Sequence, residues 1–342
     1  MKLSQFIGNR LIKTAIAILI TAWICDIIGW PPVFAVITAI VTLEPTVSES
    51  IKKGMIRFPA SAIGSAFAVI FIALFGNSPI TYTLAAFFTI ATCVKLRLHA
   101  GVLVATLTAV AMVEVIYSNF LISFFIRLGT TTIGLVVSTA VNMFLLPPDY
   151  THDIVKHIKI LNKKTGKLIE DVFENILFDE DVKVRDRMGQ LRKALNKTET
   201  LIRFQKEETK YHPLVGHEKH VFQHAQDQIL NIRMMHYHIE NLINTPIDTV
   251  SWTKEEREII HFAIKKLSQS MEDEKNYNIE DHEKQLKQLT EIFWEDNEEI
   301  TKNNKHHPTH FPPELIILYE LLSIFELITA FYINDNSTEK TV

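Results

Sequence analysis

The sequence predicts an all-α protein: a six-span transmembrane helical domain at residues 1–148, followed by a cytoplasmic antiparallel helical bundle at residues 149–342. Three observations predict this fold. The stretch from Leu11 to Pro148 is apolar and holds few charged residues. The remainder is rich in Lys, Arg, Asp and Glu, and its apolar residues repeat at helical spacing with little glycine between them. The first part therefore suits lipid and the second suits water.

Each expected span except the second is an apolar run that approaches or reaches the roughly 20 residues needed to cross about 30 Å of hydrocarbon. In chain order these runs are Leu11–Gly29, Val33–Leu43, Pro59–Phe75, Ile80–Val94, His99–Tyr117 and Phe120–Leu146. The second run is too short for a regular span, so we expect either a continuation past Glu44 and Pro45 toward Ser50, or a short or broken helix. The first run resembles a secretory signal but continues without a cleavage site of small residues, which predicts an uncleaved span.

Basic residues predict the orientation of these spans. They lie at the N-terminus, between the second and third runs, and between the fourth and fifth: Lys2, Arg10, Lys13, Lys52, Lys53, Arg57, Lys95 and Arg97. The intervening connectors contain neither Lys nor Arg. Because short loops rich in Lys and Arg stay in the cytoplasm, we expect a multi-pass protein of the plasma membrane with both termini cytoplasmic.

The second half reads as a bundle of helices of about 20 to 30 residues, separated by polar breaks. Thr253 and Glu256 have the spacing of a capping box, which predicts a helix start there. The last apolar segment, Glu314–Ile333, contains three glutamates. Because charges at mid-span are costly, we predict that this segment is a central bundle helix and not a seventh span.

Charge and cysteine content exclude several classes of function. The net charge is +5 over residues 1–148 and −9 over the rest, and an acidic soluble half disfavours a nucleic-acid partner. Only Cys25 and Cys93 are present, so neither a disulfide framework nor a cysteine metal site is expected. Two histidine groups lack an acidic ligand pattern and are expected to be solvated: His217, His220, His224, His306, His307 and His310. With no phosphate loop or nucleophile elbow either, we expect no cofactor, no metal and no enzyme.

The strongest candidate site lies on the sixth expected span. One face carries Arg127, Thr131, Gly134, Ser138 and Asn142, which fall within about 80° of one another at about 100° per residue. An arginine inside a span is costly, and at the head of a polar stripe it indicates a path for an anion. The small and hydroxyl residues of the stripe are equally typical of close helix packing, so both interpretations stay open.

Further carboxylates and a proline extend this candidate path. Asp26 and Glu114 lie at a similar depth to Arg127, where either one would neutralise it and, if protonated, exchange a proton. Glu44 and Pro45 follow the short second span. An interruption there would expose backbone groups of the kind that form substrate sites in transporters, or would simply end a helix.

Several strings of the first half resemble the aromatic acid exporter family, and in particular its Gram-positive branch with a dedicated C-terminal domain. The strings are Gly29–Ala35 (GWPPVFA), Thr42–Thr46 (TLEPT), Ser50–Phe58 (SIKKGMIRF) with Gly64, and Asn142–Pro148 (NMFLLPP). The resemblance implies a permease of the fusaric acid resistance type that moves organic anions outward. Longer relatives hold two such membrane modules, which implies that this chain acts as a dimer or higher homo-oligomer.

The combined expectation is an exporter of aromatic or related carboxylates that lies in the lipid bilayer and carries a small organic anion, coupled to protons if Glu114 or Asp26 titrates. Two alternatives stay open. Plant malate channels have a similar plan, which suggests passive conduction of organic anions. The spans would otherwise serve only to anchor the acidic bundle as a scaffold or sensor without transport.

Overall fold

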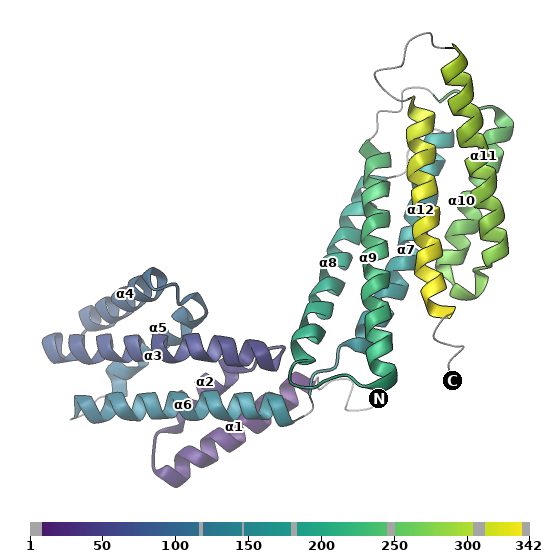
Figure 1. Ribbon diagram of the computed structural model, residues 1–342. Coiled ribbons are helices and arrows are strands. Elements are labelled where there is room, and N and C mark those ends of the chain that lie inside the picture. Colours follow the sequence, from purple (N-terminus) through teal and green to yellow (C-terminus); the bar gives the residue numbers. More distant parts are fainter. Residues whose placement is uncertain are drawn as a thin grey trace. The chain divides into compact units, whose positions relative to one another are not determined.

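The computed structural model describes residues 9–115, 119–145, 147–178, 183–244, 250–303 and 312–336. These residues are mostly helical and include no strand, which confirms the predicted all-α class for the described part of the chain (Figure 1). The chain forms two compact units. The first comprises Met1–Asp149 with Phe204–Pro213, and the second comprises Tyr150–Arg203 with Leu214–Val342. That residues 1–148 and 149–342 are separate domains stays a prediction.

Six α-helices and one 3₁₀ turn make up most of the first unit (Figure 1): α1 (Asn9–Ile28), α2 (Pro32–Thr42), α3 (Val47–Phe75), α4 (Pro79–Lys95), η2 (His99–Gly101), α5 (Val102–Val115) and α6 (Phe120–Phe144). Helix α3 packs against α4, α5 and α6, and α6 packs against α1 and α2. Helices α1, α3 and α6 are long and apolar enough to cross a membrane, and the other three are shorter apolar helices. The first unit is therefore a multi-helix membrane unit, while the count of six spans stays a prediction.

Helix α3 begins much earlier than the sequence predicts. The expected third span started at Pro59, but the helix starts at Val47 and runs for 29 residues with Pro59 inside it. Thr46 caps the helix, because its hydroxyl accepts a hydrogen bond from the backbone N–H of Glu49 at 3.1 Å. Glu49 also places a negative charge in the first turn, where the helix dipole favours it. The basic residues that the sequence assigned to a connector therefore lie on the first turns of α3.

The second expected span is a short helix followed by an interruption. Helix α2 has 11 residues, and its last turn gives way to extended backbone at Leu43. The chain stays non-helical until Thr46 caps α3. Glu44 and Pro45 thus lie in a break between two helices. The last residues of the fifth and sixth expected spans, Tyr117 and Leu146, lie outside the described residues.

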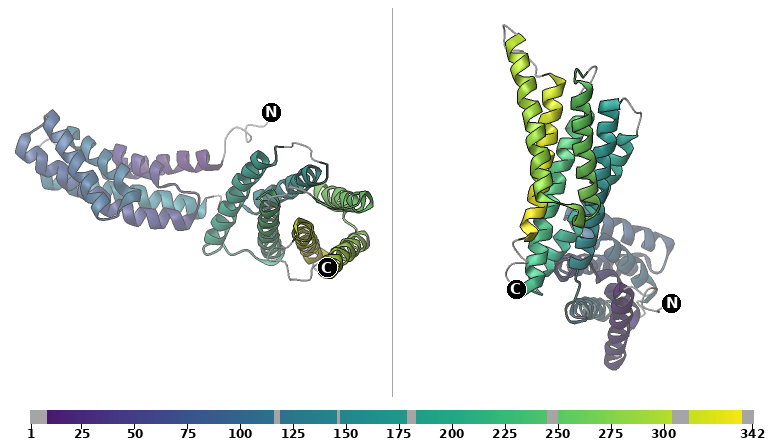
Figure 2. Two further views of the ribbon diagram at one scale, coloured as in Figure 1. Left: turned by 90° about the horizontal axis from the view of Figure 1, so that it is seen from above. Right: turned by 90° about the vertical axis from the view of Figure 1, so that its right-hand side faces the viewer.

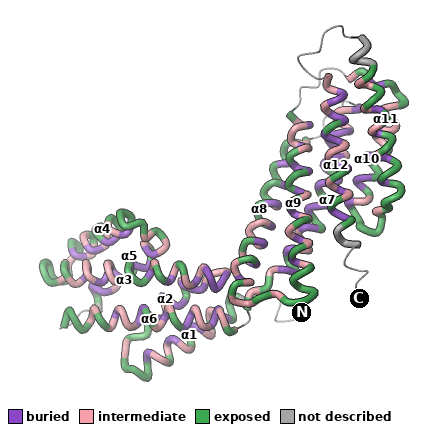
Figure 3. Tube along the Cα trace, viewed as in Figure 1, coloured by how far each residue is buried: buried purple, intermediate pink, exposed green. Residues whose placement is uncertain are grey.

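Large apolar side chains are exposed along the first unit, and Figure 3 shows exposed positions on each of its helices. Trp23, Phe125 and Phe144 are examples, with 65%, 65% and 77% of their surface exposed. In water so many exposed apolar groups would favour association, whereas hydrocarbon solvates them. The surface of this unit therefore agrees with its apolar helices in indicating a lipid environment.

The second unit is a helical bundle, whose helices are seen nearly end-on in the left view of Figure 2. Its elements are α7 (Thr151–Phe178), most of α8 (Val184–Glu208), α9 (Gly216–Asn244), α10 (Lys254–Glu272), η3 (Glu274–Asn276), α11 (Ile279–Asn303) and α12 (Pro313–Asn336). Helix α7 packs against α9 and α10, and α12 packs against α9 and α11. The predicted capping box is present at Thr253 and Glu256.

Helix α12 is long and apolar enough to span a membrane, but its apolar residues lie in the core of the second unit. Half of its apolar stretch is buried within the structure, compared with 22–28% for α1, α3 and α6. Leu318, Leu321 and Phe325 are fully buried. The buried Glu314 carboxylate accepts hydrogen bonds from the backbone N–H and hydroxyl of Ser251, at 2.7 and 2.8 Å. The apolar side chains of α12 are thus packed, and its Glu314 carboxylate is hydrogen-bonded, within the second unit, as expected for a central bundle helix.

A buried histidine should make the second unit sensitive to acid. His236 is 4% exposed, and burial, followed by the charge of Arg192, lowers its pKa from 6.5 to about 4, despite an opposing effect of Glu240. Its Nε2 lies 2.9 Å from the Thr165 hydroxyl. Between pH 6.5 and pH 4 the unfolded chain binds a proton at His236 that the folded chain does not bind. The contribution of neutral His236 to the free energy of unfolding is therefore complete above pH 6.5 and is lost as pH falls toward 4. The full effect is about 3 kcal/mol.

We therefore expect the free energy of unfolding, measured on the full chain by urea and tryptophan fluorescence, to fall between pH 7 and pH 4 less steeply in His236→Gln than in the native protein. The exposed His220 supplies the matched control, since His220→Gln should keep the native slope. Equal slopes in all three proteins would contradict the prediction.

Candidate functional site

The stripe predicted on the sixth span is one buried face of α6. Arg127, Thr131, Gly134, Ser138 and Asn142 are all buried. This confirms that the five residues share a face of one helix, while their role in transport stays a prediction. The structure divides them into two groups, one around Arg127 and one around Asn142.

Arg127 is a buried cation without a neighbouring carboxylate. It is 3% exposed, and one guanidinium nitrogen, Nη2, donates to the Thr108 hydroxyl. The guanidinium carbon lies 4.3 Å from the centre of the Phe34 ring. The other two nitrogens, Nε and Nη1, have no hydrogen-bond partner among the residues that the structure describes. Within the described ranges no ion pair reaches Arg127. A buried charge in this state is costly unless an anion or water joins it.

Three buried hydroxyl groups from three helices gather beside the guanidinium. Ser61 on α3 lies 3.2 Å from the Thr131 hydroxyl on α6 and 3.4 Å from the Thr108 hydroxyl on α5. Guanidinium and hydroxyl groups are both donors to a carboxylate, and the charged donor gives the stronger bond. The Phe34 ring adds an apolar face suited to stacking. These groups together suit a carboxylate attached to a flat, apolar body.

Neither of the expected counter-ions reaches Arg127, which corrects that expectation. Glu114 on α5 is exposed and accepts a hydrogen bond from the Tyr82 hydroxyl on α4. Asp26 is exposed near the end of α1, where its backbone carbonyl accepts from Gly29 in the following turn. Similar depth along the sequence did not bring these carboxylates to the same side of the unit. Any role for them in transport stays a hypothesis.

The second group forms around Asn142 at the other end of the stripe. Its side-chain amide donates to the Glu44 carbonyl at 3.1 Å and to the Ser50 hydroxyl at 3.0 Å. Its amide oxygen accepts from the Lys13 ammonium at 3.0 Å. Asn142 thus connects α1, α3 and α6 with the break between α2 and α3. The interruption offers the Glu44 backbone carbonyl to this face of α6, while its role as a substrate site stays a prediction.

The Glu44 side chain points to a different set of partners. Its carboxylate accepts hydrogen bonds from Arg57 at 2.6 Å and from Lys53 at 2.8 Å, both on the first turns of α3. Arg57 also donates to the Ala100 carbonyl at 3.3 Å. Glu44 is therefore paired and holds the break, which includes Pro45, against α3. It is not a free charge in the path.

Between the two groups the stripe is closed by packing. A Cβ atom on Gly134 would lie 2.4 Å from the Ala35 carbonyl oxygen, so α2 touches the backbone of α6 there. Ser138 donates to the Leu135 carbonyl of its own helix at 3.1 Å. The packing interpretation of the stripe is therefore correct at Gly134, while its two ends are Arg127 and Asn142, and Asn142 contacts the buried Lys13 of α1.

The sequence did not single out Lys13, Phe34, Thr108 or Glu208 as site residues. Lys13 was counted only for its charge, although it is 5% exposed. Phe34 and Thr108 are ordinary residues of apolar helices and become notable only because they touch Arg127. No pattern in the sequence connects Glu208 with the first unit, since 161 positions separate it from its partner Val47.

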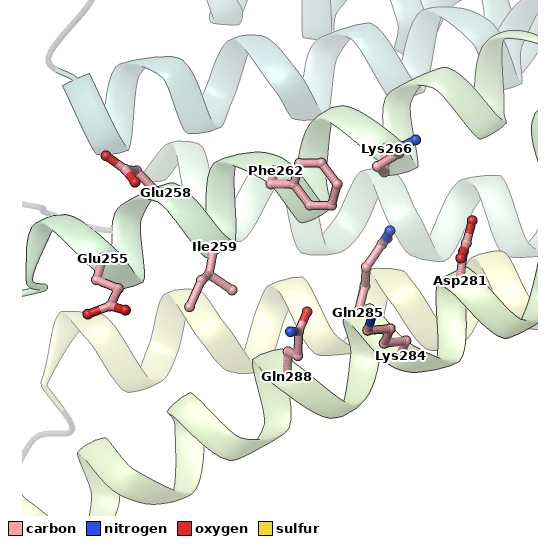
Figure 4. Close-up of a pocket in the computed structure, with 9 residues that line it drawn as sticks. All are labelled: Glu255, Glu258, Ile259, Phe262, Lys266, Asp281, Lys284, Gln285 and Gln288. Carbon is pink, nitrogen blue, oxygen red and sulfur yellow. The ribbon is translucent and has the colours of Figure 1, made fainter.

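The second unit offers a weaker candidate, a groove of about 550 Å³ between α10 and α11 (Figure 4). Its lining mixes three carboxylates and two lysines with polar and apolar groups: Glu255, Glu258, Ile259, Phe262, Lys266, Asp281, Lys284, Gln285 and Gln288. Because both negative and positive side chains line the groove, it favours neither an anionic nor a cationic ligand. The described residues include no group of three or more His, Cys, Asp or Glu that could hold a metal, and the His306, His307 and His310 cluster lies outside them.

Comparison with known proteins adds a family to this geometry. The sequence model described as "Aromatic acid exporter family member 1" matches residues 5–145. A UPF0421 protein of Oceanobacillus iheyensis is 47% identical over 98% of this chain and 98% of its own length. A UPF0421 protein of Bacillus cereus is 41% identical over 95% of this chain and 93% of its own length. One of Staphylococcus saprophyticus is 36% identical over 95% of this chain and 96% of its own length.

Proposed function

Because the chain belongs to the aromatic acid exporter family, we propose that it carries aromatic or related carboxylates outward across the cell membrane. The observation that supports the proposal is Arg127, whose buried guanidinium keeps two nitrogens without an acceptor. The substrate carboxylate would bind these nitrogens together with the hydroxyls of Ser61 and Thr108, while the Thr131 hydroxyl donates to the Arg127 carbonyl at 2.9 Å. The substrate ring would pack on Phe34. No step of this process needs bond chemistry, so the proposal is a transporter and not an enzyme.

The energetics support a substrate at Arg127 over a purely structural role. A lone arginine at the centre of a span costs about 3 kcal/mol or more. One hydrogen bond to Thr108 and the face of Phe34 offset part of that cost. A carboxylate would offset the rest of that cost only while it is bound.

The second candidate function is passive conduction of organic anions. It gains weight because no described carboxylate pairs with Arg127, and Glu114 and Asp26 lie elsewhere. Proton exchange at the substrate site therefore loses its nearest candidate groups. In both functions we propose that the chain acts as a homo-oligomer, with its termini in the cytoplasm and the second unit as a regulatory or oligomerising bundle.

Efflux from proteoliposomes separates these functions. We expect liposomes with the protein to release radiolabelled phthalate, an aromatic dianion with low passive leak, faster than protein-free liposomes. The membrane potential is clamped with potassium and valinomycin while a pH gradient is imposed. A rate that follows the pH gradient supports a proton-coupled exporter, and indifference to it supports passive conduction. A rate equal to that of protein-free liposomes would contradict transport of this class and favour a scaffold.

A further inference from the structure

The first unit buries Lys13 on α1, in addition to Arg127 and to Arg57, which is paired with Glu44. It is 5% exposed, and its ammonium donates to the Asn142 amide oxygen at 3.0 Å. An ammonium carries three N–H donors, so this single neutral partner leaves it incompletely satisfied. Among the described residues no carboxylate lies within 4 Å of the Lys13 ammonium. Lys13 thus shares with Arg127 the property of a buried charge that lacks direct neutralisation.

The surroundings hold the Lys13 ammonium in one place. Both N–H groups of the Asn142 amide are engaged, by the Glu44 carbonyl and by the Ser50 hydroxyl. The amide oxygen must therefore face Lys13, which fixes one bond of the ammonium. The orientation of the remaining donors is set by helices α1, α3 and α6, and not by the flexibility of a surface lysine.

A carboxylate of the chain itself lies close to this lysine. Glu208 is at the end of α8, in the segment Phe204–Pro213 that belongs to the first unit. Its side chain is 1% exposed, accepts a hydrogen bond from the Val47 backbone N–H at 3.1 Å and lies 2.7 Å from His212 Nδ1. Asn142 joins Lys13 to Ser50 in the first turn of α3, and the same turn holds Glu208 through the Val47 N–H. The first turn of α3 thus already accommodates a buried carboxylate beside the partner of Lys13.

We infer that the Lys13 ammonium, which Asn142 positions, and the Val47 N–H form a second carboxylate-binding site, which the side chain of Glu208 fills in this structure. Three features carry this assignment: a buried ammonium with donors to spare, a helix N-terminus that favours an anion, and a carboxylate already held there. Rotation of the Glu208 side chain would leave the site open to a substrate carboxylate. The inference rests on the proposed function, because it takes the incoming anion to be the transported one.

The two sites lie at opposite ends of one face of α6. Asn142 follows Arg127 by 15 residues, which corresponds to about 22 Å along a helix. The contact of Gly134 with Ala35 closes the face between them. A substrate would therefore displace Glu208 at Lys13 first, and would reach Arg127 only after α2 and α6 separate. Glu208 acts in this scheme as a tethered competitor of the substrate.

The test counts bound anions. The stoichiometry of radiolabelled benzoate is measured at equilibrium on the full chain in nanodiscs. We expect one benzoate per native chain, at Arg127, and two per chain in Glu208→Gln, which keeps an acceptor for Val47 but loses the charge. Adding Lys13→Met to Glu208→Gln should return the number to one. Glu207→Gln is the matched control, because this neighbouring carboxylate accepts only from the Thr46 hydroxyl at 3.2 Å and should leave one benzoate bound.

Each result separates the two proposals. One benzoate in both the native chain and Glu208→Gln overturns the second site and leaves the Arg127 site intact. Two in both Glu208→Gln and Glu207→Gln also overturns it, since any lost negative charge would then suffice. No binding to the native chain, with one Lys13-dependent benzoate in Glu208→Gln, supports the second site and refutes Arg127. No binding in any protein refutes both.

Discussion

Replacing Arg127 with methionine is expected to make the protein more stable and unable to respond to a carboxylate. Methionine fills a similar volume without a charge, so the uncompensated guanidinium no longer has to be buried. Replacing buried charges with apolar side chains stabilises other proteins by about 1 to 4 kcal/mol. We expect a gain toward the lower end of that range, because the contacts with Thr108 and Phe34 are lost with the charge.

The melting temperature of the detergent-solubilised full chain measures both parts of this prediction. Benzoate should raise the melting temperature of the native protein, since a ligand that binds only the folded state stabilises it. Arg127→Met should melt at a higher temperature without benzoate and gain nothing from it. The exposed Arg97 gives the control, and Arg97→Met should behave as the native protein. A destabilised Arg127→Met that still responds to benzoate would show that the arginine is structural.

Adding one methyl group at Gly134 should destabilise the first unit by about 1 to 3 kcal/mol, the usual cost of overpacking a well-packed interior. The new Cβ would lie 2.4 Å from the Ala35 carbonyl oxygen and 2.9 Å from the Thr38 Cβ. Because the nearest of these atoms is backbone, α2 and α6 must move apart to accept it. The melting temperature of Gly134→Ala in detergent should therefore fall by several degrees.

Gly54 on α3 provides the comparison for this substitution. A Cβ there would meet only the Leu135 side chain, at 3.6 Å, which is ordinary van der Waals contact. Gly54→Ala should thus match or slightly exceed the native melting temperature, since alanine favours a helix over glycine. Equal melting temperatures for the two alanine variants would mean that α2 and α6 do not approach as closely as the structure places them.

Much of the helical framework could be predicted because it depends on local patterns. The short α2 and the interruption at Glu44 follow from a brief apolar run and a proline. The buried face of α6 follows from helical periodicity. The start of α3 was predicted wrongly, since Pro59 and the basic residues before it read as a connector, while the cap at Thr46 carries the helix through them.

The partners of the site residues could not be predicted, because they come from distant parts of the chain. Depth along the sequence suggested Glu114 beside Arg127, but the rotation of α5 directs it to Tyr82. Likewise, the sequence indicated Lys13 only as one of the basic residues that set the orientation, whereas the fold places Asn142 of α6 beside it. The sequence gives the depth of a residue in a span, whereas the packing of the helices decides which side chains meet.

The central claim is that Arg127 binds the anion that the protein moves, and efflux of radiolabelled phthalate tests it most directly. Native protein, Arg127→Met and Arg97→Met are reconstituted at equal density, with protein-free liposomes measuring the leak. The account predicts that Arg127→Met releases phthalate no faster than protein-free liposomes, while Arg97→Met keeps the native rate. Native flux through Arg127→Met would contradict the account.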